Sequence, residues 1–266
     1  TLSESLTYIG KEAFMLVGAS ATIAEGSTFT LSVPASVTTI GDGAFKQAKF
    51  SSATFANGSE NLTVGANAFE SSALTTITFP NNLASLGENA FADCSALVSF
   101  DGSNLSDLSA NGFKVDSGIL YAYENGKVST FYVPASFAFD ENETFVVNAD
   151  VPALPANAFK GTSIKNIDLN NVTEIGAYAF ANTAITSINL GKVTVIGANA
   201  FENCTALTEV VAKNVVTIGD SAFNGASALV KFNENVEDGT LVNIPSTVTA
   251  IGNYAFYGAK FASLNM

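Results

Sequence analysis

The chain contains no His, no Arg and no Trp, and all 11 of its cationic side chains are Lys. Without His there is no imidazole for a Ser-His-Asp or Cys-His relay or for a metal site. Nucleic-acid binding requires a basic surface, and here 24 acidic residues give a net charge of −13. The same charge disfavours polyanions and anionic membrane surfaces. We therefore expect no nucleic-acid partner, no metal and no cofactor, and the composition predicts a protein that is not an enzyme.

Charged residues of both signs are scarce, at 13% of the chain, whereas 47% of the residues are apolar. The longest apolar runs are only a few residues, far short of a membrane span, so the sequence predicts no membrane insertion and an apolar interior. The two cysteines, Cys94 and Cys204, each follow a Phe by three residues, in a slot that elsewhere holds Ala, Ser or Thr. Five repeats apart, they are predicted to be buried, inert thiols that form no disulfide.

A hexapeptide of the form Ile-Gly-x-x-Ala-Phe recurs along the whole chain. Its copies begin at Ile9, Ile40, Val64, Leu86, Leu108, Leu154, Ile175, Ile196, Ile218 and Ile251. The copy at 108–113 is degenerate, because Ser109 and Gly112 replace Gly and Ala. Self-similarity at a fixed short period is typical of a solenoid. With one further coil assumed in the long gap after Phe113, the spacing predicts about eleven coils in a single solenoid over residues 1–266.

Each repeat predicts two short strands and a turn of helix. Ile77-Thr78-Phe79 alternates apolar and polar residues, and Pro80 ends this strand. Equivalent strands come one coil apart in the same direction, so they predict a parallel sheet. The residues x-x-Ala-Phe are expected to open a short helix, which an Asn before the Ala would cap. The Asn residues in that position are Asn67, Asn89, Asn157 and Asn199.

Two further positions of the hexapeptide have a predicted role. The Phe rings are expected to stack from coil to coil as an internal ladder. Pro155 occupies the Gly slot in one copy, and Pro cannot adopt a positive φ. Close backbone packing therefore explains the Gly better than a left-handed turn does.

The repeat resembles the BspA-like, or Treponema-type, class of bacterial leucine-rich repeats. The segments Ala90-Phe91-Ala-Asp-Cys94-Ser-Ala-Leu97 and Ala200-Phe201-Glu-Asn-Cys204-Thr-Ala-Leu207 match its pattern nearly letter for letter. The resemblance implies an α/β solenoid, a right-handed superhelix with the parallel sheet on its concave face and short strands and helices on the return side. It also implies a secreted or cell-surface bacterial protein, whose leader and anchor are not visible in this chain. Some members of the family look like adhesins, and the family shares no catalytic residues.

The side chains that flank the buried residue of each strand should point outward from the sheet. Two interpretations remain open for them, a solvated sheet face or a strip that binds a protein or a glycan. The candidates are Thr76, Thr78, Ser99, Asp101, Asn166, Asp168, Ser187, Asn189, Glu209 and Tyr132. Asp101 and Asp168 are expected to lie several coils apart, so they do not predict the paired carboxylates of a glycosidase.

The segment near 114–150 predicts a β-hairpin insert, with Asn125-Gly126 as its turn. Ile119, Tyr121 and Tyr123 should share one face of this hairpin. That face either packs on the next coil or forms an aromatic contact patch, since Tyr is favoured at interfaces. Smaller inserts are expected near 20–28 and 233–240.

Two functions follow from these features. The first is a non-catalytic surface protein that binds a host or bacterial surface protein or a glycan in adhesion, and the alternative is a structural spacer in a larger envelope protein. The last segment, Phe261-x-x-Leu264-x-Met266, is predicted to be a strand with nothing after it. An uncapped solenoid end exposes an apolar face. It therefore predicts either further residues or end-to-end self-association through the C-terminal coil.

Overall fold

The computed structural model describes residues 2–18, 29–105, 111–233, 241–261 and 263–265. The chain forms two compact units, Thr1–Phe137 (unit 1) and Ala138–Met266 (unit 2), and each is described by itself. The organisation of 1–266 as a single solenoid stays a prediction. The predicted inserts near 20–28 and 233–240 lie outside the described residues, except for Asn233.

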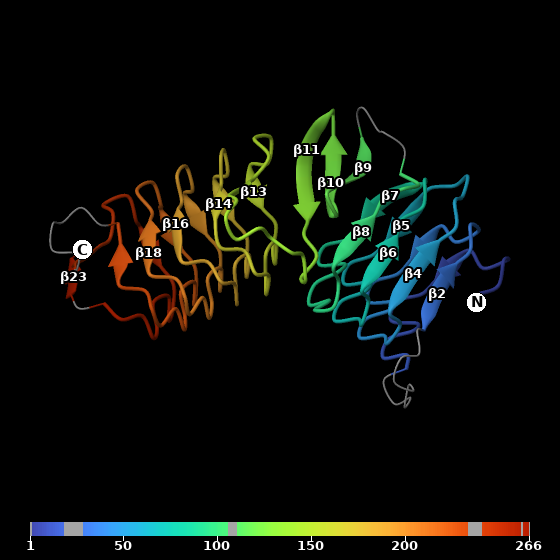
Figure 1. Cartoon of the computed structure of the whole chain (residues 1–266), viewed down its shortest axis with the longest axis horizontal. Helices are drawn as coiled ribbons and strands as arrows, with labels where there is room; N and C mark the ends of the chain where they lie inside the picture. The colour runs from blue at the N-terminus through green and yellow to red at the C-terminus, as the bar shows by residue number, and fades with distance from the viewer. Residues whose placement is uncertain (1, 19–28, 106–110, 234–240, 262, 266) are drawn as a thin grey trace. The chain divides into compact units, whose positions relative to one another are not determined.

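Unit 1 is a stack of turns. Each turn contributes one strand to a front sheet and one strand to a back sheet, and both sheets are parallel. The front sheet contains β2 (Thr30–Val33), β4 (Ser52–Phe55), β6 (Thr76–Thr78) and β8 (Ser99–Asp101) in that order (Figure 1). The back sheet contains β1 (Tyr8–Ile9), β3 (Thr39–Ile40), β5 (Leu62–Val64) and β7 (Leu83–Leu86). Alternate residues of both sheets point into one shared apolar core, as the sequence predicts.

Unit 2 repeats this plan. Its back sheet runs through β13 (Ala153–Leu154), β15 (Glu174–Ile175), β17 (Val195–Ile196), β19 (Thr217–Ile218) and β22 (Ala250–Ile251). The front strands β16 (Ser187–Asn189), β18 (Glu209–Val211) and β20 (Lys231–Phe232) form one parallel sheet. Two parallel pairs, β12 (Phe145–Val146) with β14 (Ile167–Asp168) and β21 (Leu241–Asn243) with β23 (Ser263–Asn265), complete the unit. The strand predicted at the end of the chain is therefore present as β23.

The described residues form about nine turns and not eleven, with four back strands in unit 1 and five in unit 2. The prediction counted the degenerate copy at 108–113 as a coil and assumed another in the gap after it. That part of the chain instead forms an antiparallel sheet of β9 (Gly112–Asp116), β10 (Ile119–Glu124) and β11 (Lys127–Tyr132). Each strand of this segment pairs with the strand next to it in the sequence. The segment therefore doubles back on itself and does not form a turn of the solenoid.

The predicted short helices are wrong, since the regular elements of the described residues are all strands. The residue before the motif Ala has a positive φ of 54–61° in all nine turns. A second left-handed residue follows the Phe by two positions, as at Gln47 and Asn203. An α-helix needs successive right-handed residues, so a left-handed residue every fourth position prevents it. Asn67, Asn89, Asn157 and Asn199 are therefore not helix caps, and Asn suits their position because it tolerates positive φ.

Backbone hydrogen bonds of this segment alternate between the same turn and the next one. Ala44 N donates to Gly41 O within its own turn (3.2 Å), whereas Phe45 N donates to Ala68 O of the following turn (2.7 Å). The same pattern recurs in unit 2, where Phe201 N donates to Ala222 O at 2.7 Å. This alternation fixes the register of each motif on the next.

The motif Phe rings form the predicted ladder within each unit. In unit 1, Phe14, Phe45, Phe69 and Phe91 stack with centroid separations of 5.3–5.5 Å. In unit 2, Phe159, Phe180, Phe201, Phe223 and Phe256 stack at 5.0–5.3 Å. Phe113, from the degenerate copy, belongs to neither ladder and lies on β9. Burying a ring of this size contributes roughly 2 kcal/mol.

The Gly slot is confirmed as a site of close backbone approach. A Cβ atom added to Gly197 would lie 2.7 Å from Ile175 O and 2.9 Å from Ala177 N of the preceding turn, and the φ of Gly197 is not positive. Gly10, in the first turn of unit 1, would meet only the Tyr8 ring at 3.6 Å. Pro155 likewise occupies the first back-sheet turn of unit 2. The Gly position of the hexapeptide therefore accepts a side chain in the first turn of each unit, where no preceding turn of that unit packs against it.

Candidate functional site

The front sheet of unit 1 presents two columns of small hydroxyl side chains. Thr76 pairs in register with Ser99, and Thr78 pairs with Asp101. Between them Ile77 and Phe100 are buried, so the flanking side chains point to the opposite face, as predicted. The columns continue to the first front strand, where Thr30 Oγ1 and Ser52 Oγ are 2.9 Å apart. The sequence-predicted residues Thr76, Thr78, Ser99 and Asp101 are thus adjacent on one surface.

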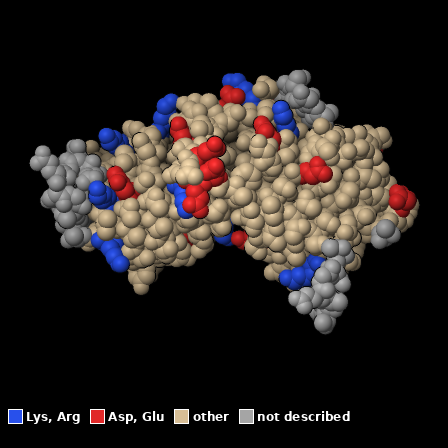
Figure 2. Space-filling view, viewed as in Figure 1, with Lys and Arg blue, Asp and Glu red and all other residues tan. Residues whose placement is uncertain are grey.

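Asp101 is the acidic member of this surface, and its carboxylate is held by neighbours. Ser103 N donates to Oδ1 at 2.9 Å, and Thr78 Oγ1 donates to Oδ2 at 3.1 Å. The backbone hydrogen bond from Ser103 contributes most to lowering the pKa of Asp101, and the Thr78 hydroxyl acts in the same direction. Elsewhere over β2, β4, β6 and β8, Figure 2 shows few charged side chains. This face is therefore polar but nearly uncharged.

The front strands of unit 2 carry a different chemistry. Ser187, Glu209 and Lys231 lie in register on β16, β18 and β20, which brings opposite charges onto adjacent strands. Asn189 flanks the same face beside Val211. The candidates near β14 are hydrogen-bonded to backbone groups of unit 2. Asn166 Nδ2 donates to Glu141 O at 3.1 Å, and Asp168 Oδ1 accepts from Asn170 N at 2.8 Å.

The predicted hairpin is confirmed, with Asn125 and Gly126 at positive φ between β10 and β11. The third strand, β9, was not predicted. Phe100 N donates to Gly118 O at 3.2 Å, and Leu120 is part of the unit 1 core. The antiparallel sheet therefore covers the last turn of unit 1 and replaces the coil that the sequence predicted there.

The three tyrosines of this sheet have separate surroundings. Tyr121 and Tyr123 alternate with core-facing Ala122, and the Tyr121 ring lies 6.2 Å from Phe131. Tyr132 is not part of the outward strip predicted for it, because β11 pairs with β10 in the antiparallel sheet and is not a strand of the front sheet. Its hydroxyl donates to Leu86 O at 3.4 Å. Burial raises the pKa of both Tyr121 and Tyr132.

Both cysteines are free and buried in the small-residue slot. Cys94 Sγ donates to Phe69 O at 3.0 Å, and Cys204 Sγ donates to Phe180 O at 2.9 Å. Burial raises the pKa of Cys94 from 9.0 to about 11, although its hydrogen bond with Ser72 acts in the opposite direction. Each thiol therefore links one turn to the preceding one.

We expect both thiols to resist iodoacetamide at neutral pH in the folded protein and to react fully in concentrated urea, as measured by intact mass. The raised folded pKa also predicts a loss of stability as pH rises from about 9 to about 11, because the unfolded Cys94 thiol loses its proton first. Cys94→Ala should lack that part of the pH dependence. Rapid alkylation of the native chain would contradict the buried position.

Among the described residues, no group of three or more His, Cys, Asp or Glu side chains could hold a metal ion. No helix in the described part of the chain is long and apolar enough to cross a membrane.

Sequence reasoning missed three exposed tyrosines on the turns of unit 2, Tyr178, Tyr254 and Tyr257. Tyr178 and Tyr254 occupy the hexapeptide position before Ala, where three other turns of the chain's second half hold Asn or Ser. That departure from the repeat was the available signal.

Comparison with known proteins agrees with this architecture. Six copies of a family model described as "BspA type Leucine rich repeat region" match residues 24–137, 132–238 and 232–266. No curated protein matches the chain.

Three solved bacterial structures resemble the fold. A leucine-rich cell surface protein from Faecalibacterium prausnitzii is 21% identical with a TM-score of 0.64, covering 88% of this chain and 71% of its own. A leucine-rich repeat protein from Eubacterium ventriosum is 19% identical with a TM-score of 0.60, covering 95% of this chain and 80% of its own. The pneumococcal vaccine antigen PcpA is 20% identical with a TM-score of 0.51, covering 97% of this chain and 75% of its own. At these identities the likeness concerns the fold alone.

Proposed function

Since the chain belongs to the BspA-type leucine-rich repeat family, we propose that it is a non-catalytic binding or adhesion protein of a bacterial surface. Two structurally similar proteins support this location, one described as a cell surface protein and the other as a vaccine antigen. Repeat proteins of this kind bind through broad surfaces and not through a single pocket. A protein or a glycan on a host or bacterial surface is the proposed partner.

The observation that carries the proposal is the outward face of the front sheets. In unit 1 the side chains of Thr76 and Ser99 lie in adjacent strands at a spacing of about 4.8 Å. Thr76 and Ser99 are partly exposed, whereas their inward-facing neighbours Ile77 and Phe100 are buried in the core. Polar groups repeated at a fixed spacing on a rigid sheet can form several hydrogen bonds to one partner at little entropic cost.

Substituting Arg on this face should abolish binding. The test is a screen of immobilised matrix proteins and glycans, repeated with Thr76→Arg for unit 1 and Asn189→Arg for unit 2. A long cation in the middle of the face blocks close approach, so we expect at least a hundredfold loss for the variant in the unit that binds.

Thr63→Arg is the matched control, because Thr63 is exposed on the back strand β5 of unit 1. All three variants should keep the melting temperature of the parent within about 2 °C, as surface substitutions do. If binding survives both front-sheet substitutions, the outward face of the front sheets is not the binding surface. A screen that finds no ligand would contradict the proposal and favour a structural spacer.

End-to-end self-association through the C-terminal coil stays a prediction.

A further inference from the structure

The turn edge of unit 2 carries three exposed aromatic rings, Tyr178, Tyr254 and Tyr257, which we call the tyrosine ridge. Their exposed fractions are 37%, 72% and 67%. The Tyr254 and Tyr257 rings meet edge to face, with centroids 6.1 Å apart and an interplanar angle of 85°. Lys160 Nζ lies 5.4 Å from the centre of the Tyr178 ring, which restricts the orientation of that ring.

The backbone makes tyrosine an unfavourable choice at two of the three ridge positions. Tyr178 and Tyr254 have φ values of 58° and 57°, in the left-handed region. The equivalent residues Asn157 and Asn199 adopt the same conformation, and Asn tolerates it better than a bulky side chain does. Folding alone would therefore favour Asn at these two positions. The aromatic rings require another explanation.

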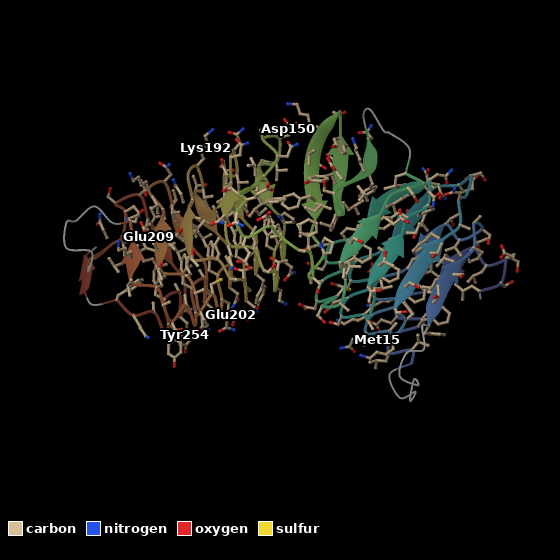
Figure 3. The ribbon with its side chains drawn as sticks, viewed as in Figure 1. Met15, Asp150, Lys192, Glu202, Glu209 and Tyr254 are labelled. Atoms are coloured by element: carbon tan, nitrogen blue, oxygen red, sulfur yellow. The ribbon has the colours of Figure 1, made fainter. Side chains whose placement is uncertain are left out.

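Tyr178 and Tyr254 lie on the same edge of unit 2, and two turns without tyrosine at this position lie between them. Tyr178 N donates to Ala198 O at 3.0 Å, Asn199 N donates to Asp220 O at 2.9 Å, and Ser221 N donates to Asn253 O at 2.8 Å. These bonds place Tyr178 three turns from Tyr254, about 14 Å at strand spacing. Figure 3 shows Tyr254 and Glu202 on this edge and Lys192 on the opposite edge of the unit.

We propose that the tyrosine ridge is a second binding site, separate from the front sheets, for a neutral polysaccharide chain. A sugar ring has an apolar C–H face that packs on an aromatic ring, and hydroxyls at its rim that bond to amides and hydroxyls. Asn199 and Ser221 lie in the turns between the aromatic positions and supply such groups.

The alternatives fit the same edge less well. A protein interface of ordinary size needs about 800 Å² on each partner with a contiguous apolar centre. Here Tyr178 is separated from the Tyr254–Tyr257 pair by two turns that hold Asn199 and Ser221 at the equivalent position. An anionic polymer would meet Glu202 on this edge, on a chain of net charge −13. A linear, uncharged sugar polymer can extend along the edge across these turns and meets no charge repulsion from Glu202.

The test is affinity gel electrophoresis of the full chain in gels that contain soluble starch, β-1,3-glucan, xylan or galactomannan, with heparin as the anionic comparison. We expect retardation by at least one neutral polymer and none by heparin. Tyr178→Asn and Tyr254→Asn should each weaken that binding about tenfold, and the double variant more. Because Asn suits the left-handed backbone, the melting temperature should stay equal or rise by up to about 2 °C.

Tyr8→Asn is the matched control, since Tyr8 is 60% exposed on β1 of unit 1, outside the ridge. It should leave retardation unchanged. No retardation by any of the four neutral polymers would overturn the proposal, as would retardation that the double variant retains. If Thr76→Arg or Asn189→Arg abolishes polysaccharide binding and the ridge variants do not, the front sheets bind the glycan and the ridge does not.

Discussion

Replacing Phe201 with Ala is expected to lower the free energy of unfolding by about 3–5 kcal/mol. The Phe201 ring is fully buried between Phe180 and Phe223, with centroid separations of 5.1 and 5.0 Å. Removing it leaves a cavity between two stacked rings that hydrogen bonds on both sides hold in register. The neighbouring turns cannot close the gap without breaking those bonds.

The measurement is the midpoint of urea unfolding, followed by circular dichroism. Phe29→Ala is the matched control, because this ring is 49% exposed and meets Phe50 only at 6.5 Å. Its loss should cost less than about 1 kcal/mol. Equal midpoints for the two variants would mean that the motif rings do not form the core of the stack.

Gly197→Ala is expected to destabilise the protein by about 3 kcal/mol, although it adds a single methyl group. The added Cβ would lie 2.7 Å from Ile175 O, within the distance at which the backbone of one turn must move away from the other. That carbonyl also accepts the hydrogen bond of Gly197 N at 2.8 Å. The methyl group therefore strains the contact that joins two consecutive turns.

Gly10→Ala adds a methyl group at the same position of the hexapeptide, but in a turn with no preceding backbone packed against it. Its Cβ would meet only the Tyr8 ring at 3.6 Å, which is an ordinary van der Waals distance. We expect no destabilisation, and a gain of up to about 1 kcal/mol from the smaller entropy of the unfolded chain. Both variants are compared by urea unfolding. A similar loss for both would point to a conformational need for Gly, and no loss for either would contradict close turn-to-turn packing.

The repeat predicted the parallel strands, the stacked rings, the packed Gly slot and the buried cysteines, because these features follow from the spacing of the copies and from the residues that share each position. Ile40, Ile175 and their equivalents recur at one period, so each must occupy the same place in successive turns. The outward columns followed in the same way, since side chains alternate across a strand. Within unit 1, Thr76 and Ser99 lie side by side as the sequence predicts.

The spacing between motifs, in contrast, did not predict whether a segment forms a turn of the solenoid or pairs with itself. The segment 112–132 has almost the length of one coil, yet it pairs with itself as an antiparallel sheet. The right-handed helix predicted at x-x-Ala-Phe fails for a related reason. Phe45 N bonds to the next turn and not to its own, a choice that exists only once the turns are stacked.

The sequence by itself therefore determined the repeat, its strands and its buried rings, since a fixed period imposes the same environment on equivalent residues. The tertiary structure decided the left-handed turns, the number of turns and the position of the tyrosine ridge. Those features depend on hydrogen bonds between residues about 20 positions apart, such as Tyr178 and Ala198. Local preferences do not fix such bonds, because they form only when one turn lies against another.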